Sequence, residues 1–109
     1  MTIKTERTRA LNDALRTIGN TVRVMLTRSI LALPSTDIGE ILRAVATFND
    51  FNDDNDPYGE HDCAILTAAG QKVMFKIDYY DPSMTSGSED PSDPSRTARV
   101  MTIMLASDY

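Results

Sequence analysis

The chain has 109 residues, of which 41% are hydrophobic and 25% are charged, close to the averages of globular proteins. This length accommodates one modest hydrophobic core, so we expect a single domain over residues 1–109. The one cysteine, Cys63, excludes an intrachain disulfide, and no segment has the apolar length of a signal peptide or a membrane span. We therefore expect a soluble cytoplasmic protein.

The formal net charge of −5 is unevenly distributed along the chain. Residues 1–48 hold seven basic and four acidic side chains, a net charge of +3, whereas residues 49–109 hold four basic and twelve acidic side chains, a net charge of −8. Because contacts to phosphate depend on Lys and Arg, this composition disfavours direct nucleic-acid binding. The asymmetry fits either a well-solvated surface or electrostatic steering of a protein partner.

Two segments have the spacing of three and four between apolar residues that is typical of amphipathic helices. The first covers residues 5–18 and ends at Gly19-Asn20, where a left-handed cap costs little. The second follows Pro34, with Ser35 or Thr36 as its N-cap, and ends near Asn49. The predicted core faces are Ala10, Leu11, Ala14, Leu15 and Ile18 on the first helix, and Ile38, Ile41, Leu42, Val45 and Phe48 on the second.

Apolar and β-branched runs predict four strands, at residues 21–27, 62–68, 72–80 and 97–107. Residues 28–34 (RSILALP) fit either a continuation of the first strand or a turn of helix. The order α-β-α-β-β-β predicts an α+β fold, with two helices packed on a mainly antiparallel four-stranded sheet. Two acidic loops, near residues 49–61 and 81–96, lie between these elements.

The connection between the second and third strands, AGQ at residues 69–71, indicates a β-hairpin and decides which side chains face the core. We expect Phe75 and Ile77 to pack against Leu15 and Leu42, with Lys76 on the opposite face. With an even number of connecting residues the core face holds Ala64, Leu66, Val73, Phe75, Ile77 and Tyr79, and the opposite face His61, Cys63, Ile65, Met74, Lys76, Asp78 and Tyr80. A three-residue connection reverses this match.

The first acidic loop has the oxygen-rich composition that suits a Ca²⁺ or Mg²⁺ site, but its spacing argues against one. Aligned as an EF-hand from Asp50, it has Asn55 in place of the required glycine and His61 in place of the bidentate glutamate. We expect no metal and no cofactor.

His61 is the only histidine, so any imidazole chemistry depends on it. Strand alternation places it on one face with Asp78 and Tyr80, and we expect these three residues to form a polar cluster. A contact that fastens the loop to the sheet is the favoured interpretation, and the alternative is acid–base or nucleophilic chemistry that involves Cys63. Gly-rich phosphate loops, GxSxG, HExxH and CxxC motifs do not occur in the sequence, so we assign no catalytic residue.

Four segments resemble a family of small uncharacterised bacterial proteins carried on plasmids and other mobile elements. They are DNDPYGEHD (54–62), KIDYYDPS (76–83), GSEDPSDPS (87–95) and RVMTIMLASDY (99–109). RALNDALR (9–16) and the Leu-Pro before the second helix are similar too, so the resemblance covers nearly the whole chain. The family has no established activity. The resemblance implies an accessory or counter-defence factor that binds host proteins.

We expect a non-enzymatic binding protein, an inhibitor of the anti-CRISPR or anti-restriction type that contacts a basic protein surface. The alternatives are a small metal-dependent or His61-centred enzyme, and a plasmid-transfer or toxin–antitoxin accessory protein. The candidate partner-binding side chains are acidic: Asp53, Asp54, Asp56, Glu60, Asp81, Glu89, Asp90 and Asp93.

Overall fold

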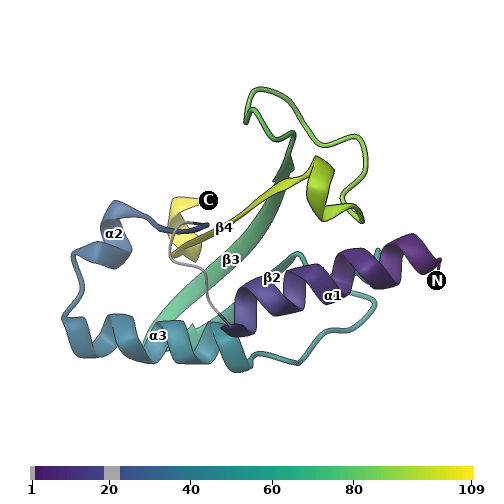
Figure 1. Cartoon of the computed structure of the whole chain (residues 1–109). Helices are drawn as coiled ribbons and strands as arrows, with labels where there is room; N and C mark the ends of the chain where they lie inside the picture. The colour runs from purple at the N-terminus through teal and green to yellow at the C-terminus, as the bar shows by residue number, and fades with distance from the viewer. Residues whose placement is uncertain (1, 19–22) are drawn as a thin grey trace.

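The computed structural model describes residues 2–18 and 23–109. Its α-helices are α1 (Ile3–Ile18), α2 (Arg28–Leu31) and α3 (Ser35–Thr47), and its strands are β1 (Val24–Leu26), β2 (Cys63–Ala68), β3 (Gln71–Tyr80) and β4 (Ala98–Leu105). Short 3₁₀ turns at Pro94–Arg96 and Ala106–Asp108 flank β4. α1 and α3 lie along the same side of the sheet, and the hydrophobic core fills the layer between them and the strands (Figure 1).

The strands form one sheet in the order β1-β4-β3-β2. β3 is antiparallel to β2 and β4, whereas β1 is parallel to β4. The α+β class is therefore confirmed, but the described residues contain three α-helices and the sheet is mixed. Residues 28–31 of the ambiguous RSILALP segment form α2. β1 is followed by two helices and pairs with β4, not with the next strand along the chain, so no tight hairpin turn fixes its direction as antiparallel.

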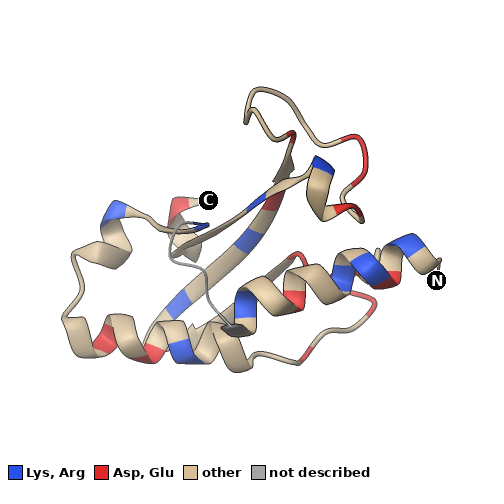
Figure 2. Ribbon diagram, in the orientation of Figure 1, with Lys and Arg blue, Asp and Glu red and all other residues tan. Residues whose placement is uncertain are grey.

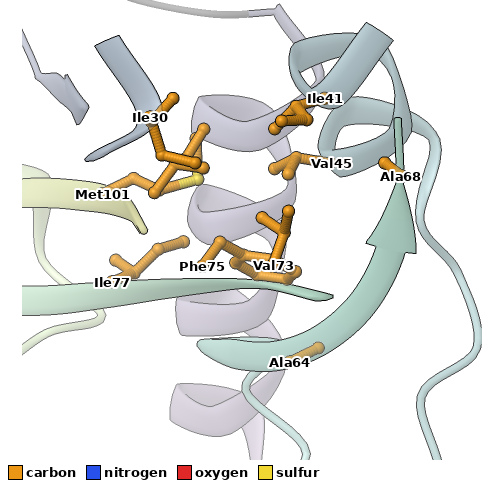
Figure 3. Close-up of a cluster of buried hydrophobic side chains, with 10 residues drawn as sticks. Ile30, Ile41, Val45, Ala64, Ala68, Val73, Phe75, Ile77 and Met101 are labelled. Atoms are coloured by element: carbon orange, nitrogen blue, oxygen red, sulfur yellow. The ribbon is translucent and has the colours of Figure 1, made fainter. Parts of the chain in front are cut away.

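The β2–β3 hairpin determines the core face of the sheet. Its connection is the residue pair Ala69 and Gly70, whose φ angles of 52° and 71° suit a tight hairpin turn. Ala64 therefore pairs with Phe75, as predicted for an even connection. Phe75 and Ile77 are 0% and 4% exposed, and Figure 3 shows them within the buried cluster.

The contact predicted between this face and Leu42 of α3 is wrong. Ile41 and Val45 of α3 are buried, whereas Leu42 is 39% exposed. Successive helical residues differ by about 100°, so Leu42 falls beyond the edge of the buried stripe. Leu15 of α1 packs against the core as predicted.

α1 buries a polar face that the apolar pattern did not predict. Ala10 and Ala14, two members of the predicted stripe, are exposed. Thr8, Asn12 and Arg16 follow one another at intervals of four and are 4%, 0% and 6% exposed. Their burial requires polar partners, since an unpaired buried polar group is costly.

The start of the second predicted helix differs from expectation. The predicted helix end at Gly19-Asn20, the side chain of Ile18 and the first two residues of the predicted strand at 21–27 lie outside the described residues. α3 begins at Ser35 with Pro34 in the cap position, and no side-chain hydrogen bond caps it, so the predicted capping by Ser35 or Thr36 is wrong. The fixed φ of proline already suits a helix start.

Candidate functional site

Asn12 is the centre of a buried polar network beneath α1. Its side-chain amide donates to the Glu60 carbonyl at 3.0 Å and to the Tyr79 hydroxyl at 2.8 Å. Its carbonyl oxygen accepts from Arg99 Nε at 2.6 Å. The Tyr79 hydroxyl in turn donates to the Glu60 carboxylate at 2.8 Å. All hydrogen-bonding groups of the Asn12 side chain therefore have partners, which explains how a fully buried amide is accommodated.

Arg99 and Tyr79 extend this network to the second acidic loop. Arg99 donates to the Pro91 carbonyl, and its guanidinium lies 5.1 Å from the centre of the Tyr79 ring. Burial raises the pKa of Tyr79 well above its usual value and lowers the pKa of Arg99. α1 is thus fastened to both acidic loops, through Glu60 in the first and Pro91 in the second.

Arg16 binds the carboxyl end of α3. Its Nη1 donates to the carbonyls of Val45, Ala46 and Phe48 at 3.0, 3.3 and 2.6 Å. Carbonyls at the end of a helix lack intrahelical donors and carry the negative end of the helix dipole. The Arg16 guanidinium supplies hydrogen-bond donors to these carbonyls and a positive charge that complements the dipole. Nη2 forms an ion pair with Asp13 at 3.0 Å.

Asp13 joins Arg16 to His61. The Nδ1 of His61 lies 2.9 Å from the same Asp13 oxygen, and its Nε2 lies 3.6 Å from the Asp56 carboxylate. The imidazole stacks on Phe51 with 3.8 Å between ring centres and 5° between planes. Both ring nitrogens face carboxylates, so the arrangement clamps the first acidic loop to α1 rather than presenting a free base to solvent.

The predicted cluster of His61, Asp78 and Tyr80 does not form. His61 precedes β2 and has a φ of 55°, which takes it out of the strand alternation on which the prediction depended. Asp78 pairs instead with Lys76 at 3.1 Å on the opposite face of the sheet, and this contact raises the pKa of Lys76. The loop is therefore fastened by Asp13 to α1, and not by Asp78 to the sheet as predicted, while the contact with Asp56 lies within the loop.

A shallow hollow lies between α1 and the first acidic loop. One pocket of about 170 Å³ is lined by Arg9, Phe51, Asn52, Asp53, Asp56, Gly59 and His61. A neighbouring pocket of about 320 Å³ shares Asp53, Asp56 and Gly59 with it and adds Thr2, Thr5, Pro57 and Tyr58. Tyr58, which is 78% exposed, lies at its margin. We refer to these two pockets together as the α1–loop hollow.

Six of the eight predicted partner-binding carboxylates already have partners in the chain. In the first loop, Asp56 accepts from the His61 backbone N–H and Glu60 accepts from the Tyr79 hydroxyl. In the second loop, Asp81 accepts from Ser83, Glu89 from Arg96, Asp90 from Ser92 and Asp93 from Ser95, and Asp90 also forms an ion pair with Lys4. Hydrogen bonds from Ser83 and Ser92 lower the pKa values of Asp81 and Asp90. Across residues 2–18 and 23–109, no hydrogen bond or ion pair engages the side-chain carboxylates of Asp53 and Asp54.

The part of the chain that the structure describes contains neither a metal-binding cluster nor a membrane-spanning helix. No group of three or more His, Cys, Asp or Glu side chains there has the geometry to hold a metal ion. None of the helices described has both the length and the apolar character needed to cross a membrane.

Comparison with known proteins gives one match. Residues 26–108 match the family described as Protein of unknown function (DUF3768). The chain belongs to this family. The DUF3768 match covers β2, β3, β4, both acidic loops, α2 and α3, whereas α1 and all of β1 except Leu26 precede it. No curated protein and no solved structure matches the chain. The expected resemblance to a family without an assigned activity is confirmed to this extent.

Several site residues of this DUF3768 protein were not predicted from the sequence. Asn12, Asp13, Arg16 and Arg99 make most of the contacts that position the loops, yet none was a candidate. A signal for two of them was present, because Thr8, Asn12 and Arg16 share one helical face at intervals of four. Arg99 gave no such signal, since its partners lie 87 and 8 residues away along the chain.

Proposed function

We propose that this protein is a non-enzymatic binding protein that docks the margin of the α1–loop hollow on a basic surface of a partner protein. The observation that carries the proposal is the pair of exposed carboxylates, Asp53 and Asp54, which have no partner within the described residues and lie in the same loop as the exposed Tyr58. Exposed tyrosine is a frequent anchor in interfaces, and rim charges accelerate association.

The charge distribution supports the first acidic loop as the contact surface. Figure 2 shows the acidic segments of both loops at the same end of the molecule, with the basic N-terminal half of α1 between them. Lys4 lies 3.7 Å from Asp90 and so offsets part of the charge of the second loop. The two loops therefore do not merge into one negative surface, and Asp53 and Asp54 carry the proposal.

We propose that the protein acts in this way as a counter-defence factor of a plasmid or another mobile element. A basic surface on a nucleic-acid-handling protein normally contacts phosphate, so a protein that covers it competes with nucleic acid. An inhibitor of the anti-CRISPR or anti-restriction type acts in this way. We therefore predict that nucleic acid added to the complex displaces the protein from its partner.

The test compares two variants with the same change in net charge. Asp53→Asn with Asp54→Asn removes two loop carboxylates that have no partner within the described residues, whereas Glu40→Lys makes an equal change in net charge at an exposed position of α3. The partner is captured on the wild-type chain from host extract, purified, and its association is followed across a salt series. We expect the double variant to associate about threefold more slowly or worse, and Glu40→Lys to behave like the wild type.

Association should also slow as the Debye length falls from about 10 Å at 0.1 M salt to about 3 Å at 1 M. An association rate that is insensitive to salt and identical in all three proteins would refute the proposal. Equal slowing in both variants would show that net charge matters and the position of Asp53 and Asp54 does not, which also refutes it.

A further inference from the structure

β2 is an edge strand with an open hydrogen-bonding side. It lies at the end of the sheet order β1-β4-β3-β2, and it pairs only with β3 among the described strands. The Ile77 N–H donates to the Asp62 carbonyl at 2.7 Å, and the register then places Ala64, Leu66 and Ala68 in the hydrogen-bonded pairs. The backbone N–H and C=O groups of Cys63, Ile65 and Thr67 therefore point outward from the sheet.

This edge lacks the features that usually prevent strand pairing. Proteins protect long edges with charged side chains, proline, bulges or very short strands. β2 has six residues, CAILTA, with no charge and no proline, and it pairs with β3 without a bulge. The other edge strand, β1, has only three residues. Ile65 is 51% exposed, although its cross-strand neighbour Met74 is buried.

We propose that β2 pairs with β2 of a second copy of this chain, antiparallel about a two-fold axis at Ile65, so that the two sheets become continuous. The sequence of the edge is suited to this occupant. Ile65 then faces its own symmetry mate, and Cys63 faces Thr67 of the other copy. In this register the outward-pointing backbone groups of Cys63, Ile65 and Thr67 all form hydrogen-bonded pairs with the other copy. The core-side pair, Ala64 with Leu66, is also apolar, and no like charges meet.

The proposed dimer predicts a salt response opposite to that of the basic partner. Each copy carries a formal net charge of −5, so two copies repel each other at long range. Added salt screens this repulsion and should strengthen dimerisation, whereas it should weaken binding to a basic surface. Failure of the dimer and failure of the proposed function can therefore be distinguished in separate experiments.

Sedimentation velocity of the full chain over a concentration series at low and moderate salt tests the proposal. The test variant is Ile65→Lys, which places two like charges at the two-fold axis. Its control is Ile3→Lys, which changes an apolar residue that is 66% exposed on α1 and alters the net charge equally. We expect a reversible wild-type dimer, unchanged affinity in Ile3→Lys, and affinity reduced about tenfold or more in Ile65→Lys. Circular dichroism melts establish that both variants fold.

A cysteine variant tests the register directly. In Thr67→Cys, the new thiol and Cys63 are four positions apart on one strand, about 13 Å, too far for a disulfide within one copy. In the proposed dimer each faces the other across the interface at a Cα separation of about 5.5 Å, within disulfide range. Mild oxidation should give a covalent dimer of Thr67→Cys and none of Thr47→Cys, which places the thiol at the exposed end of α3.

A wild-type chain that remains monomeric at every concentration and salt overturns the proposal. A dimer that Ile65→Lys leaves intact, or that Thr67→Cys does not cross-link, also overturns it, because the copies then associate through another surface or in another register.

Discussion

Arg16→Met is the substitution for which the structure gives the clearest energetic expectation. The side chain of Arg16 is 5% exposed, and its guanidinium contacts three carbonyls at the end of α3 as well as Asp13. It also lies 5.3 and 5.8 Å from the ring centres of Phe51 and Phe75. Methionine preserves an apolar side chain of similar length but donates no hydrogen bond, so the change isolates the polar contacts.

The expected loss follows from the groups that remain without a donor. The carbonyls of Ala46 and Phe48 lose their side-chain donor, whereas Asp13 keeps its contact with His61. Each buried polar group left unsatisfied costs about 1–3 kcal/mol, so we expect a loss of about 3 kcal/mol or more. Measured against a total stability of about 5–15 kcal/mol for a domain, this is a large fraction. With a urea slope of about 1.5 kcal/mol per molar, the unfolding midpoint should fall by about 2 M or more.

Urea denaturation of the wild type, Arg16→Met and the control Arg7→Met measures the effect. Arg7 lies on the same helix and is exposed, so its replacement should change the free energy of unfolding by less than about 0.5 kcal/mol. Hydrogen exchange adds a local readout, because amides near the end of α3 should exchange faster in Arg16→Met. An unfolding free energy of Arg16→Met within error of the wild type would refute the capping role.

Three further predictions concern the core, the clamp and a half-buried acid, Asp62. Phe75→Ala should lower the free energy of unfolding by about 3–5 kcal/mol in urea denaturation, and a change within error would mean that Phe75 is not in the core. His61→Ala should lower the melting temperature, because it removes the stack on Phe51 and the contact with Asp13, at a cost of about 1–2 kcal/mol. Partner binding at low temperature should survive. Full stability together with loss of a measured activity would favour an enzyme instead. Burial raises the pKa of Asp62 in the folded state. Between the unfolded pKa, about 4, and the higher folded pKa, the folded state retains a proton that the unfolded state has released. The free energy of unfolding therefore falls as the pH rises through this range. Asp62→Asn should therefore raise the melting temperature at pH 7 and leave it unchanged at pH 3, and no gain at pH 7 would contradict the burial effect.

The local and short-range features of the fold could be predicted from the sequence. The β2–β3 hairpin, its register and the burial of Phe75 follow from strand alternation and one turn, which span few residues. The parallel pairing of β1 with β4 could not be predicted in the same way. Its partners, such as Leu26 and Ile103, are far apart along the chain, and no turn chemistry relates them.

The site was predicted less well because its contacts depend on position in space rather than on residue type. His61 was predicted to fasten the first acidic loop to the sheet through Asp78, whereas it fastens the loop to α1 through Asp13, which lies 48 residues away on the polar side of the predicted helix. The rule that polar residues face solvent fails for α1, since Asn12 and Arg16 are buried by partners that no local pattern reveals.

The two proposed surfaces share a structural dependence on His61, which is two residues before the first residue of β2. The His61 clamp holds the first acidic loop, which carries Asp53 and Asp54, against α1, and the same chain segment leads directly into the open edge at Cys63. A weakened clamp should therefore loosen the acidic contact surface and the start of the edge strand together on heating, whereas at low temperature the remaining contacts of the loop, such as Asn12 with the Glu60 carbonyl, hold it in place. Asp53 lies in the first acidic loop and Ile65 in β2, and neither is a partner of the other in a hydrogen bond or ion pair of the described residues, so their substitutions should act independently on the two kinds of association.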